Sequence, residues 1–422
     1  MESPQYNKKK IINDPVYGFI SLPFDLIFDI IEHPYFQRLR RIKQLGLTHL
    51  VYPGALHTRF HHALGAMHLT MKAIEVIRSK GHQITQKEAK ATALGILLHD
   101  IGHGPFSHAL EYSIVQGVTH EDISSFFMQR LNREFKGKLD LAIEIFEDRY
   151  DKKPFLHQLI SSQLDMDRLD YLKRDSFFTG VSEGVINSDR IISMLNVKDG
   201  QLCVEAKGIY SIEKFIIARR LMYWQVYLHK TVLSAESLVV RILKRAKELA
   251  NQGIELFCTD ALHYFLYQKI DKSQFESNEA TIQQFAALDD FDITASIKMW
   301  TKQEDPILST LCKSLLDRNL YRIKLSDRKI PKSEIKLIED ELMQLGVAEK
   351  DLDYFVFSNS IANNAYQPQK DKINLLYKNG ETKDVALAAD QLNISALSKQ
   401  VKKYFLCSPK QPMVNNLPKL RR

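Results

Sequence analysis

The spacing of apolar residues predicts helices over most of the first 320 positions. From Asp25 onward, leucine and isoleucine recur at three- and four-residue intervals, the period of a helix with one buried face. Gly81 and Gly102 follow such stretches and are typical of helix ends. The pattern predicts helices near 61–79, 86–99, 121–135, 139–150, 155–172 and 188–196, and a long helical region over about 209–250.

Polar turn residues mark two exceptions within this helical part. The first 20 residues read as a short extended arm, with Asp14, Pro15 and Gly18 supplying turn chemistry. The pair Asp199-Gly200 lies between two short apolar runs and predicts a β-hairpin.

The pattern changes after residue 320, where short alternating runs appear. They predict strands at 321–325, 354–357 and 373–377, a helix at 333–345, a hairpin turn at Asn379-Gly380 and a last helix over about 386–405. We therefore expect a mainly α protein. A helical body would span 1–320, with its functional site within 55–175, and a smaller α+β C-terminal unit would span 321–422.

Composition narrows the class of protein. Hydrophobic residues make up 45% and charged residues 26% of 422, as in ordinary globular proteins. The net charge of +7 suits anionic ligands such as phosphates without requiring nucleic acid. Four scattered cysteines argue against a disulfide framework or a zinc–thiolate site. No signal segment and no apolar run of about 20 residues is present, so we expect a cytoplasmic protein outside the membrane.

Candidate chemistry concentrates in residues 55–120, which hold nine of the 14 histidines. The clearest motif is His99-Asp100, delivered by an apolar helical run and followed by Gly102. Burying a histidine and a carboxylate together is costly, and a shared metal ion would offset that cost. Nitrogen and carboxylate ligands suit Zn, Fe, Mn, Ni or Co. Taken alone, the pair is equally compatible with an ordinary structural role.

Two further segments carry polar groups at helical spacing. Arg59 lies one turn before His62 at a predicted helix start, where a guanidinium can grip phosphate. Between 163 and 175, acidic and phenolic side chains recur every three or four residues. Without context, a solvated charged face explains this second pattern as well.

Taken together, these segments resemble the deoxynucleoside triphosphate triphosphohydrolase branch of the HD superfamily of metal phosphohydrolases. The resemblance covers roughly residues 8–240. It implies a helical HD-domain core and hydrolysis of dNTPs to deoxynucleoside and tripolyphosphate. The segments that carry it are Phe36-Gln37-Arg38-Leu39-Arg40, Lys43-Gln44-Leu45-Gly46, Tyr52-Pro53-Gly54-Ala55, His99-Asp100-Ile101-Gly102-His103-Gly104-Pro105-Phe106-Ser107-His108 and Asp167-Arg168-Leu169-Asp170-Tyr171.

The resemblance implies a role for each matching residue of the catalytic machinery. A divalent metal (Fe, Mn, Mg, Zn, Ni or Co) would lower the pKa of a bound water and polarise the α-phosphate. His108 would protonate the leaving 5′ oxygen, with Glu111 and His120 orienting or relaying, and His103 would meet phosphate oxygens. The implied metal ligands are His62, His99, Asp100 and Asp167.

The resemblance also implies a substrate pocket. Gln44 and Leu45 would read the 3′-hydroxyl, and Tyr171 would exclude a 2′-hydroxyl. Three departures leave the nucleotide preference open: Tyr223 replaces a histidine, Leu228 a glutamine and Arg168 a lysine. The complete implied set is Gln44, Leu45, Arg59, Arg168, Tyr171, Asp175, Tyr223 and Tyr227, with His229 and Lys230 bordering the nucleotide.

The family further implies a guanine-nucleotide activator site and a homo-oligomer, either a dimer or a tetramer. Lys10, Glu32, Gln37 and Arg40 resemble the activator set, with Glu32 in place of an aspartate. Two alternatives stay open. One is an HD-type phosphodiesterase or nucleotidase acting on other nucleotides. The other is a regulatory protein that binds nucleotides or nucleic acid, which the basic run 38–41 would support but which we do not favour.

Overall fold

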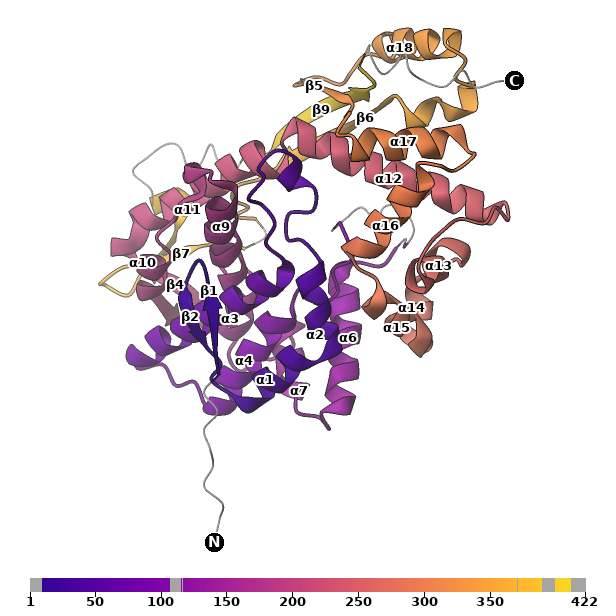
Figure 1. The fold of residues 1–422 in the computed structure, drawn as a ribbon. Coiled ribbons are helices and arrows are strands. Elements are labelled where there is room, and N and C mark those ends of the chain that lie inside the picture. Colours follow the sequence, from indigo (N-terminus) through magenta and orange to yellow (C-terminus); the bar gives the residue numbers. More distant parts are fainter. Residues whose placement is uncertain (1–9, 107–114, 116, 370, 389–398, 411–422) are drawn as a thin grey trace.

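The computed structural model describes residues 10–106, 115, 117–369, 371–388 and 399–410. Helices dominate these residues, as the mainly α prediction requires (Figure 1). The body is built from α1 (Asp25–Glu32), α2 (Pro34–Gln37), α3 (Arg59–Ser79), α4 (Gln86–Leu98), α6 (His120–Glu134), α7 (Asp140–Phe146), α8 (Phe155–Ile160), α9 (Met166–Thr179), α10 (Ser188–Ser193) and α11 (Ile209–Met222).

Three of these helices, α3, α4 and α9, form the centre of the body. α4 begins at a capping box in which Thr85 and Glu88 satisfy each other's backbone N–H groups. The Asp165 carboxylate caps α9, and Gly180, with a φ of 73°, ends it. Because α3 packs against both other helices, the ends of all three meet in the interior.

The long helical region predicted over 209–250 is present, with one interruption. A π-helical turn, Tyr223–Tyr227, separates α11 from α12 (Lys230–Asn251). α12 runs from the body into a second group of helices (Figure 1). This group contains α13 (Asp260–Tyr267), α14 (Lys272–Ser277), α15 (Glu279–Ala287), α16 (Asp290–Trp300) and α17 (Pro306–Leu316).

Strands form three small sheets. A hairpin of β1 (Ile11–Asp14) and β2 (Gly18–Ser21) replaces the expected extended arm and packs against α3. β5 (Arg322–Ser326) and β6 (Phe357–Asn363) flank β9 (Val401–Ser408), near α18 (Lys332–Gln344). The third sheet has the order β3 (Leu195–Lys198), β4 (Gln201–Glu205), β7 (Asn374–Leu376) and β8 (Thr382–Asp384), followed by α19 (Val385–Ala388).

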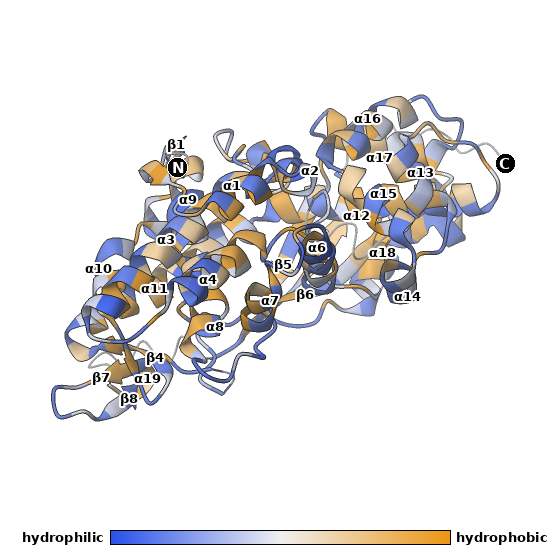
Figure 2. Ribbon diagram, turned by 90° about the horizontal axis from the view of Figure 1, so that it is seen from below, coloured by the Kyte–Doolittle hydropathy of each residue, from blue (hydrophilic) through white to orange (hydrophobic). Residues whose placement is uncertain are grey.

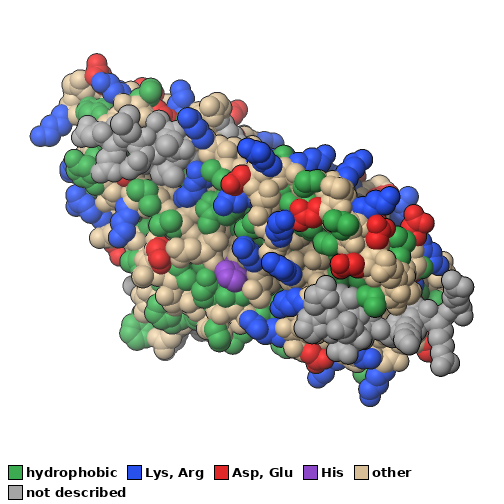
Figure 3. All heavy atoms as spheres, turned by 90° about the horizontal axis from the view of Figure 1, so that it is seen from above, with side chains coloured by type: hydrophobic (Ala, Val, Ile, Leu, Met, Phe, Trp, Pro, Cys, Tyr) green, Lys and Arg blue, Asp and Glu red, His purple; other side chains and the backbone are tan. Residues whose placement is uncertain are grey.

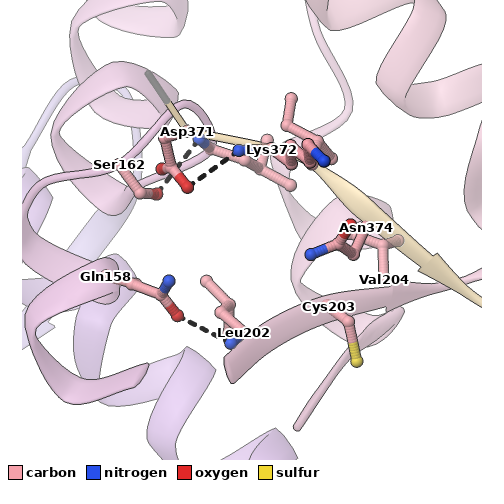
Figure 4. Close-up of a pocket in the computed structure, with 10 residues that line it drawn as sticks. Gln158, Ser162, Leu202, Cys203, Val204, Asp371, Lys372 and Asn374 are labelled. Carbon is pink, nitrogen blue, oxygen red and sulfur yellow. Dashed lines mark hydrogen bonds between the residues drawn. The ribbon is translucent and has the colours of Figure 1, made fainter. Parts of the chain in front are cut away.

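The third sheet ties the C-terminal segment to the helical body. β7 runs parallel to β4, which belongs to the hairpin at Asp199-Gly200. Beside this junction, the Asp371 carboxylate accepts the backbone N–H of Gln163 at 3.1 Å. Figure 4 shows Asp371, Gln158 and Leu202 among the residues around a hollow at this junction. The hollow between these segments measures about 20 Å³, which is room for about one water molecule. The body and the predicted C-terminal unit are thus joined through hydrogen-bonded backbone.

The predicted helix over 386–405 is wrong at its C-terminal end. Within the described residues, α19 spans Val385–Ala388, whereas residues 401–408 form β9, which pairs with both β5 and β6. The segment Val401–Ser408 contains Val, Tyr and Phe, which favour strands when partners cover both edges. The strand predicted at 354–357 begins only at Phe357, after a 3-10 turn over Glu349–Tyr354.

Hydropathy follows this architecture. Buried apolar side chains run continuously from the body through α12 into the second helical group. In Figure 2 the molecule is elongated, with β7, β8 and α19 at one end and α13 to α18 towards the other. Among the described residues, no helix combines the length and apolar character needed to cross a bilayer.

Candidate metal centre and nucleotide site

The four predicted metal ligands come from the ends of the three central helices. His62 lies in the first turn of α3, and Asp167 lies in the first turn of α9. His99 is the residue that ends α4, and Asp100 follows it. The turn after Asp100 passes very close to α6, because a Cβ at Gly102 would lie 2.3 Å from the carbonyl oxygen of His120. Gly102 therefore lets the His-Asp turn sit against α6.

These side chains converge closely enough to share one ion. His62 Nε2 lies 3.1 Å from Asp167 Oδ1 and 3.8 Å from Asp100 Oδ2. His99 Nε2 lies 3.3 Å from Asp100 Oδ1 and 3.6 Å from Asp167 Oδ1. One ligand atom from each of His62, His99 and Asp100 falls within 4.8 Å of the others.

The second nitrogen of each imidazole decides which atom is free to bind. His62 Nδ1 donates to Asp170 Oδ2 at 2.7 Å, and His99 Nδ1 donates to the Ile96 carbonyl at 2.6 Å. When the rings are neutral, both Nε2 atoms therefore carry a lone pair that faces the carboxylates. They are buried and make no hydrogen bond of good geometry. Such orphaned nitrogens among carboxylates fit a divalent metal.

The electrostatics also favour a cation. Burial lowers the pKa of His62, but the carboxylates of Asp167 and Asp170 outweigh burial and raise that pKa to about 10. Burial likewise opposes ionisation of Asp167, yet the two imidazoles hold the pKa of its carboxyl below its ordinary range. The cluster thus stabilises positive charge at the place where a metal would lie.

A second set of cationic and imidazole groups borders the cluster. The Arg59 guanidinium, predicted to meet phosphate, pairs with the Asp100 carboxylate. His103 Nε2 lies 3.4 Å from Asp100 Oδ1, and burial and then Arg59 lower the pKa of His103 to about 3. The His103 ring stacks on His120 with centroids 3.9 Å apart. A neutral His103 is thus in contact with the predicted relay residue.

The predicted catalytic residues His108 and Glu111 lie outside the described residues. The loop that leads to them is held by Arg38, whose guanidinium donates to the carbonyls of Ile101 and His103 at 3.2 and 2.9 Å. Arg38 is fully buried, and burial lowers its pKa to about 9. Arg38 is the first residue of the basic run 38–41, so this part of the run has a structural role in the interior of the protein.

Polar and aromatic side chains form a wall two turns further along α9. Asp175 accepts from His57 Nε2 at 2.8 Å and from the Tyr227 hydroxyl at 2.7 Å. The Tyr227 ring contacts Tyr171, with centroids 6.1 Å apart, and Tyr223, with centroids 5.1 Å apart. The π-helical turn carries Tyr223 and Tyr227, and it brings them to α9. The structure thus groups four of the predicted substrate residues.

The other predicted substrate residues have different surroundings. Arg168 pairs with the Asp165 carboxylate through both its backbone N–H and its guanidinium. The Gln44 side-chain oxygen is buried without a hydrogen-bond partner, and Leu45 packs on the core. His229 caps α12 at the N–H of Thr231.

The four predicted activator residues lie around α1 and α2. Gln37 donates to the Ile31 carbonyl at 2.7 Å, beside exposed Glu32. Arg40 donates to the Gln37 amide oxygen at 2.8 Å and covers the Phe60 ring. The Lys10 ammonium covers a ring of α1, Phe28. The structure therefore gathers this set in one region.

Sequence reasoning gave no role to three residues that the structure places at the site. Asp170 orients His62, His57 holds Asp175, and Arg219 is a buried arginine on α11 whose charge acts on Tyr171. Asp170 and His57 lay within or beside the recognised motifs, but nothing in their spacing showed their partners. Arg219 belongs to a different helix, so only the fold reveals its position.

Known proteins match this chain over the same elements. The HD domain family model matches residues 59–175, and the model for the HD associated region matches residues 186–259. The crystal structure of a phosphohydrolase from Bacteroides thetaiotaomicron has 54% sequence identity and a TM-score of 0.91, covering 95% of this chain and 100% of that one.

This chain covers different shares of the length of two sequence relatives. An uncharacterized protein of Bacillus subtilis, YwfO, is 32% identical over 394 residues, covering 90% of this chain and 88% of that protein. The deoxynucleoside triphosphate triphosphohydrolase SAMHD1 homolog of Dictyostelium discoideum is 33% identical over 257 residues, covering 57% of this chain and 50% of that protein. The chain belongs to the HD-domain phosphohydrolases.

Proposed function

We propose that this protein hydrolyses deoxynucleoside triphosphates to deoxynucleoside and tripolyphosphate. The observation that carries the proposal is the buried cluster of His62, His99, Asp100 and Asp167 with the Asp175–Tyr227 pair on the adjoining wall. Metal ligands are common to many phosphohydrolases, whereas a carboxylate and phenols beside them suit a sugar. The similarity to a dNTP triphosphohydrolase over half of that protein's length supports the same substrate class.

In this proposal His62, His99, Asp100 and Asp167 would hold a divalent metal, which would supply an activated water and polarise the α-phosphate. Attack at the α-phosphorus breaks its bond to the 5′ oxygen, which takes up a proton as the nucleoside leaves. Arg59 and neutral His103 lie beside Asp100 and meet phosphate oxygens. His120, stacked on His103, is proposed as the relay partner of the acid His108, with Glu111 orienting that acid; both of the latter residues lie outside the described part of the chain.

The aromatic wall selects the sugar. Both oxygens of the Asp175 carboxylate face donors, and a carboxylate can accept further hydrogen bonds from a sugar hydroxyl. The rings of Tyr171 and Tyr227, in edge-to-face contact, line the proposed pocket, and we propose that an added 2′-hydroxyl would meet this aromatic surface. Arg168, Gln44 and Leu45 complete the proposed pocket, with Tyr223 at its border. Buried Gln44 offers an oxygen for the 3′-hydroxyl.

We also propose that Lys10, Glu32, Gln37 and Arg40 bind a guanine nucleotide as an activator and that the protein works as a homo-oligomer. The support is their gathering around α1, where Glu32 can accept from a base and Lys10 and Arg40 supply positive charge. Basic side chains outnumber acidic ones on the face seen in Figure 3, in line with anionic ligands.

The deciding experiment incubates the protein with each dNTP and rNTP in the presence of Mn²⁺, Mg²⁺, Fe²⁺ or Co²⁺, with and without GTP or dGTP. Chromatography identifies the products. Deoxynucleoside and tripolyphosphate, absent with Asp167→Ala, would support the proposal. No turnover of any triphosphate, or release of mono- or diphosphates, would contradict it and favour a phosphodiesterase or nucleotidase.

A further inference from the structure

A chain of buried charges connects the N-terminal hairpin to the proposed metal centre. Asp14, the last residue of β1, accepts from Arg174 Nη1 at 2.7 Å. Arg174 Nε donates to Asp170 Oδ2 at 3.0 Å, and that oxygen accepts from His62 Nδ1 at 2.7 Å. The side chains of Asp14, Arg174, Asp170 and His62 are at most 2% exposed. Water therefore cannot replace any link in the chain.

The surrounding elements leave room for this series of charged side chains and for little else. Gly65, on α3, faces the Asp170–Arg174 pair, and a Cβ there would lie 1.9 Å from Asp170 Oδ1 and 2.2 Å from Arg174 Nη2. Tyr17, in the turn of the hairpin, covers the Arg174 guanidinium with its ring 5.5 Å away. The hairpin and two helices thus enclose the chain of charges from several sides.

We propose that Asp14 is a positioning residue that tunes the metal ligand His62 through Arg174 and Asp170. This inference rests on the proposed metal site. Without Asp14, Arg174 would neutralise Asp170, and the His62 N–H would face a pair with no net charge. With Asp14, the three groups carry one net negative charge. A more negative Asp170 polarises His62 and makes its Nε2 a stronger metal ligand.

The geometry of Asp14 offers a variant that isolates this effect. Asp14 Oδ1 accepts the backbone N–H groups of Val16 and Tyr17 at 2.9 and 3.0 Å, whereas Oδ2 faces Arg174. Asp14→Asn can keep its amide oxygen on the turn while removing the charge opposite Arg174. Asn13→Ala, an exposed position on the same strand, serves as the matched control.

The experiment measures Mn²⁺ and Co²⁺ binding to metal-free full-length protein by calorimetry, together with the Co²⁺ absorption spectrum and the Tm without metal. We expect Asp14→Asn to weaken binding by about 3- to 10-fold and to shift the Co²⁺ spectrum. Asp170→Asn, one link closer, should weaken binding by about 10- to 100-fold. Asn13→Ala should match the wild type.

A lower metal-free Tm with unchanged Co²⁺ affinity and spectrum would show a purely structural role and overturn the proposal. If Asp14→Asn does not fold, Asp14→Ser removes the charge and keeps an oxygen that can accept from the turn. An unchanged affinity in that variant would equally overturn the proposal. A wild type that binds metal but hydrolyses no dNTP would refute only the proposed substrate, and one that binds no metal would refute both proposals.

Discussion

The proposed metal centre and the proposed activator region are held together in opposite ways. At the metal centre, His62, Asp100 and Asp167 come from residues up to 105 positions apart and are joined by contacts between three helices. In the activator region, Gln37 and Arg40 are three residues apart and bond each other, and Arg40 and Glu32 are exposed. One site is shaped by the whole fold, and the other by a short stretch of chain.

This difference indicates how each site meets its ligand. The proposed metal ligands are largely buried and have fixed partners, so they would lose little freedom when an ion binds. Exposed side chains that bond one another must exchange those contacts for a nucleotide. We therefore expect substitutions at the metal centre to remove activity outright, and substitutions in the activator region to alter regulation.

The largest effect is expected for a proposed metal ligand. Asp167→Ala should lower dNTP hydrolysis by roughly 1,000-fold or more, since the ion carries both water activation and charge stabilisation. Product chromatography measures the loss, and circular dichroism checks the fold. Retention of more than about a tenth of wild-type activity would show that the chemistry does not depend on this cluster.

A smaller effect is expected at the wall beside the metal. Asp175→Asn should lower kcat/KM for dNTPs by about 10- to 100-fold, because the sugar and the donors of His57 and Tyr227 lose a charged acceptor. Its metal affinity should stay within about twofold of wild type, measured by calorimetry. An unchanged preference for dNTPs over rNTPs in this variant would remove the sugar role of Asp175.

A substitution in the proposed activator region should change only the stimulation of activity by a guanine nucleotide. Arg40→Ala should reduce stimulation by GTP or dGTP by about tenfold, because one of two proposed cationic contacts is lost. Metal affinity should stay at the wild-type level, since Arg40 lies outside the ion's surroundings. A fall in metal affinity would mean that the two regions are not separate.

The smallest effect on activity is expected at the end of α4 remote from the proposed metal centre, where a substitution should change the stability of the protein instead. Lys153, Thr85 and Tyr150 outweigh burial and lower the pKa of Glu88 to about 2. The depressed pKa contributes stability above pH 4.5 that is lost as the pH falls towards 2. Glu88→Gln should therefore cost roughly 2–3 kcal/mol at pH 7 and less near pH 2. Urea unfolding at several pH values measures it, with exposed Glu75→Gln as the control.

The sequence was sufficient for features that depend on local pattern. The period of apolar residues predicted the central helices, and Asp199-Gly200 marked a real hairpin. The motif positions also predicted that His62, His99, Asp100 and Asp167 lie together, as they do, although their role as ligands stays a proposal.

Features that depend on distant partners were not predictable. Residues 401–405, the first part of β9, were assigned to a helix because the two neighbouring strands, β5 and β6, are far away in sequence. Arg168 was expected among the substrate residues, and the sequence did not show that its guanidinium pairs with Asp165, a carboxylate one turn away. Asp14 showed only turn chemistry in the sequence, and its link to Arg174 spans 160 residues.

The pairing of β7 with β4 has a consequence for synthesis of the chain. Val204 and Leu375 are neighbours in one sheet, so the edge of β4 that faces away from β3 has no strand beside it until β7 has been synthesised. During that interval an unpaired strand edge is open to other chains. A truncation at residue 320, the expected end of the body, would make this state permanent, and we expect such a fragment to aggregate. The C-terminal segment thus covers an edge of β4 that would otherwise be open to pairing with other chains.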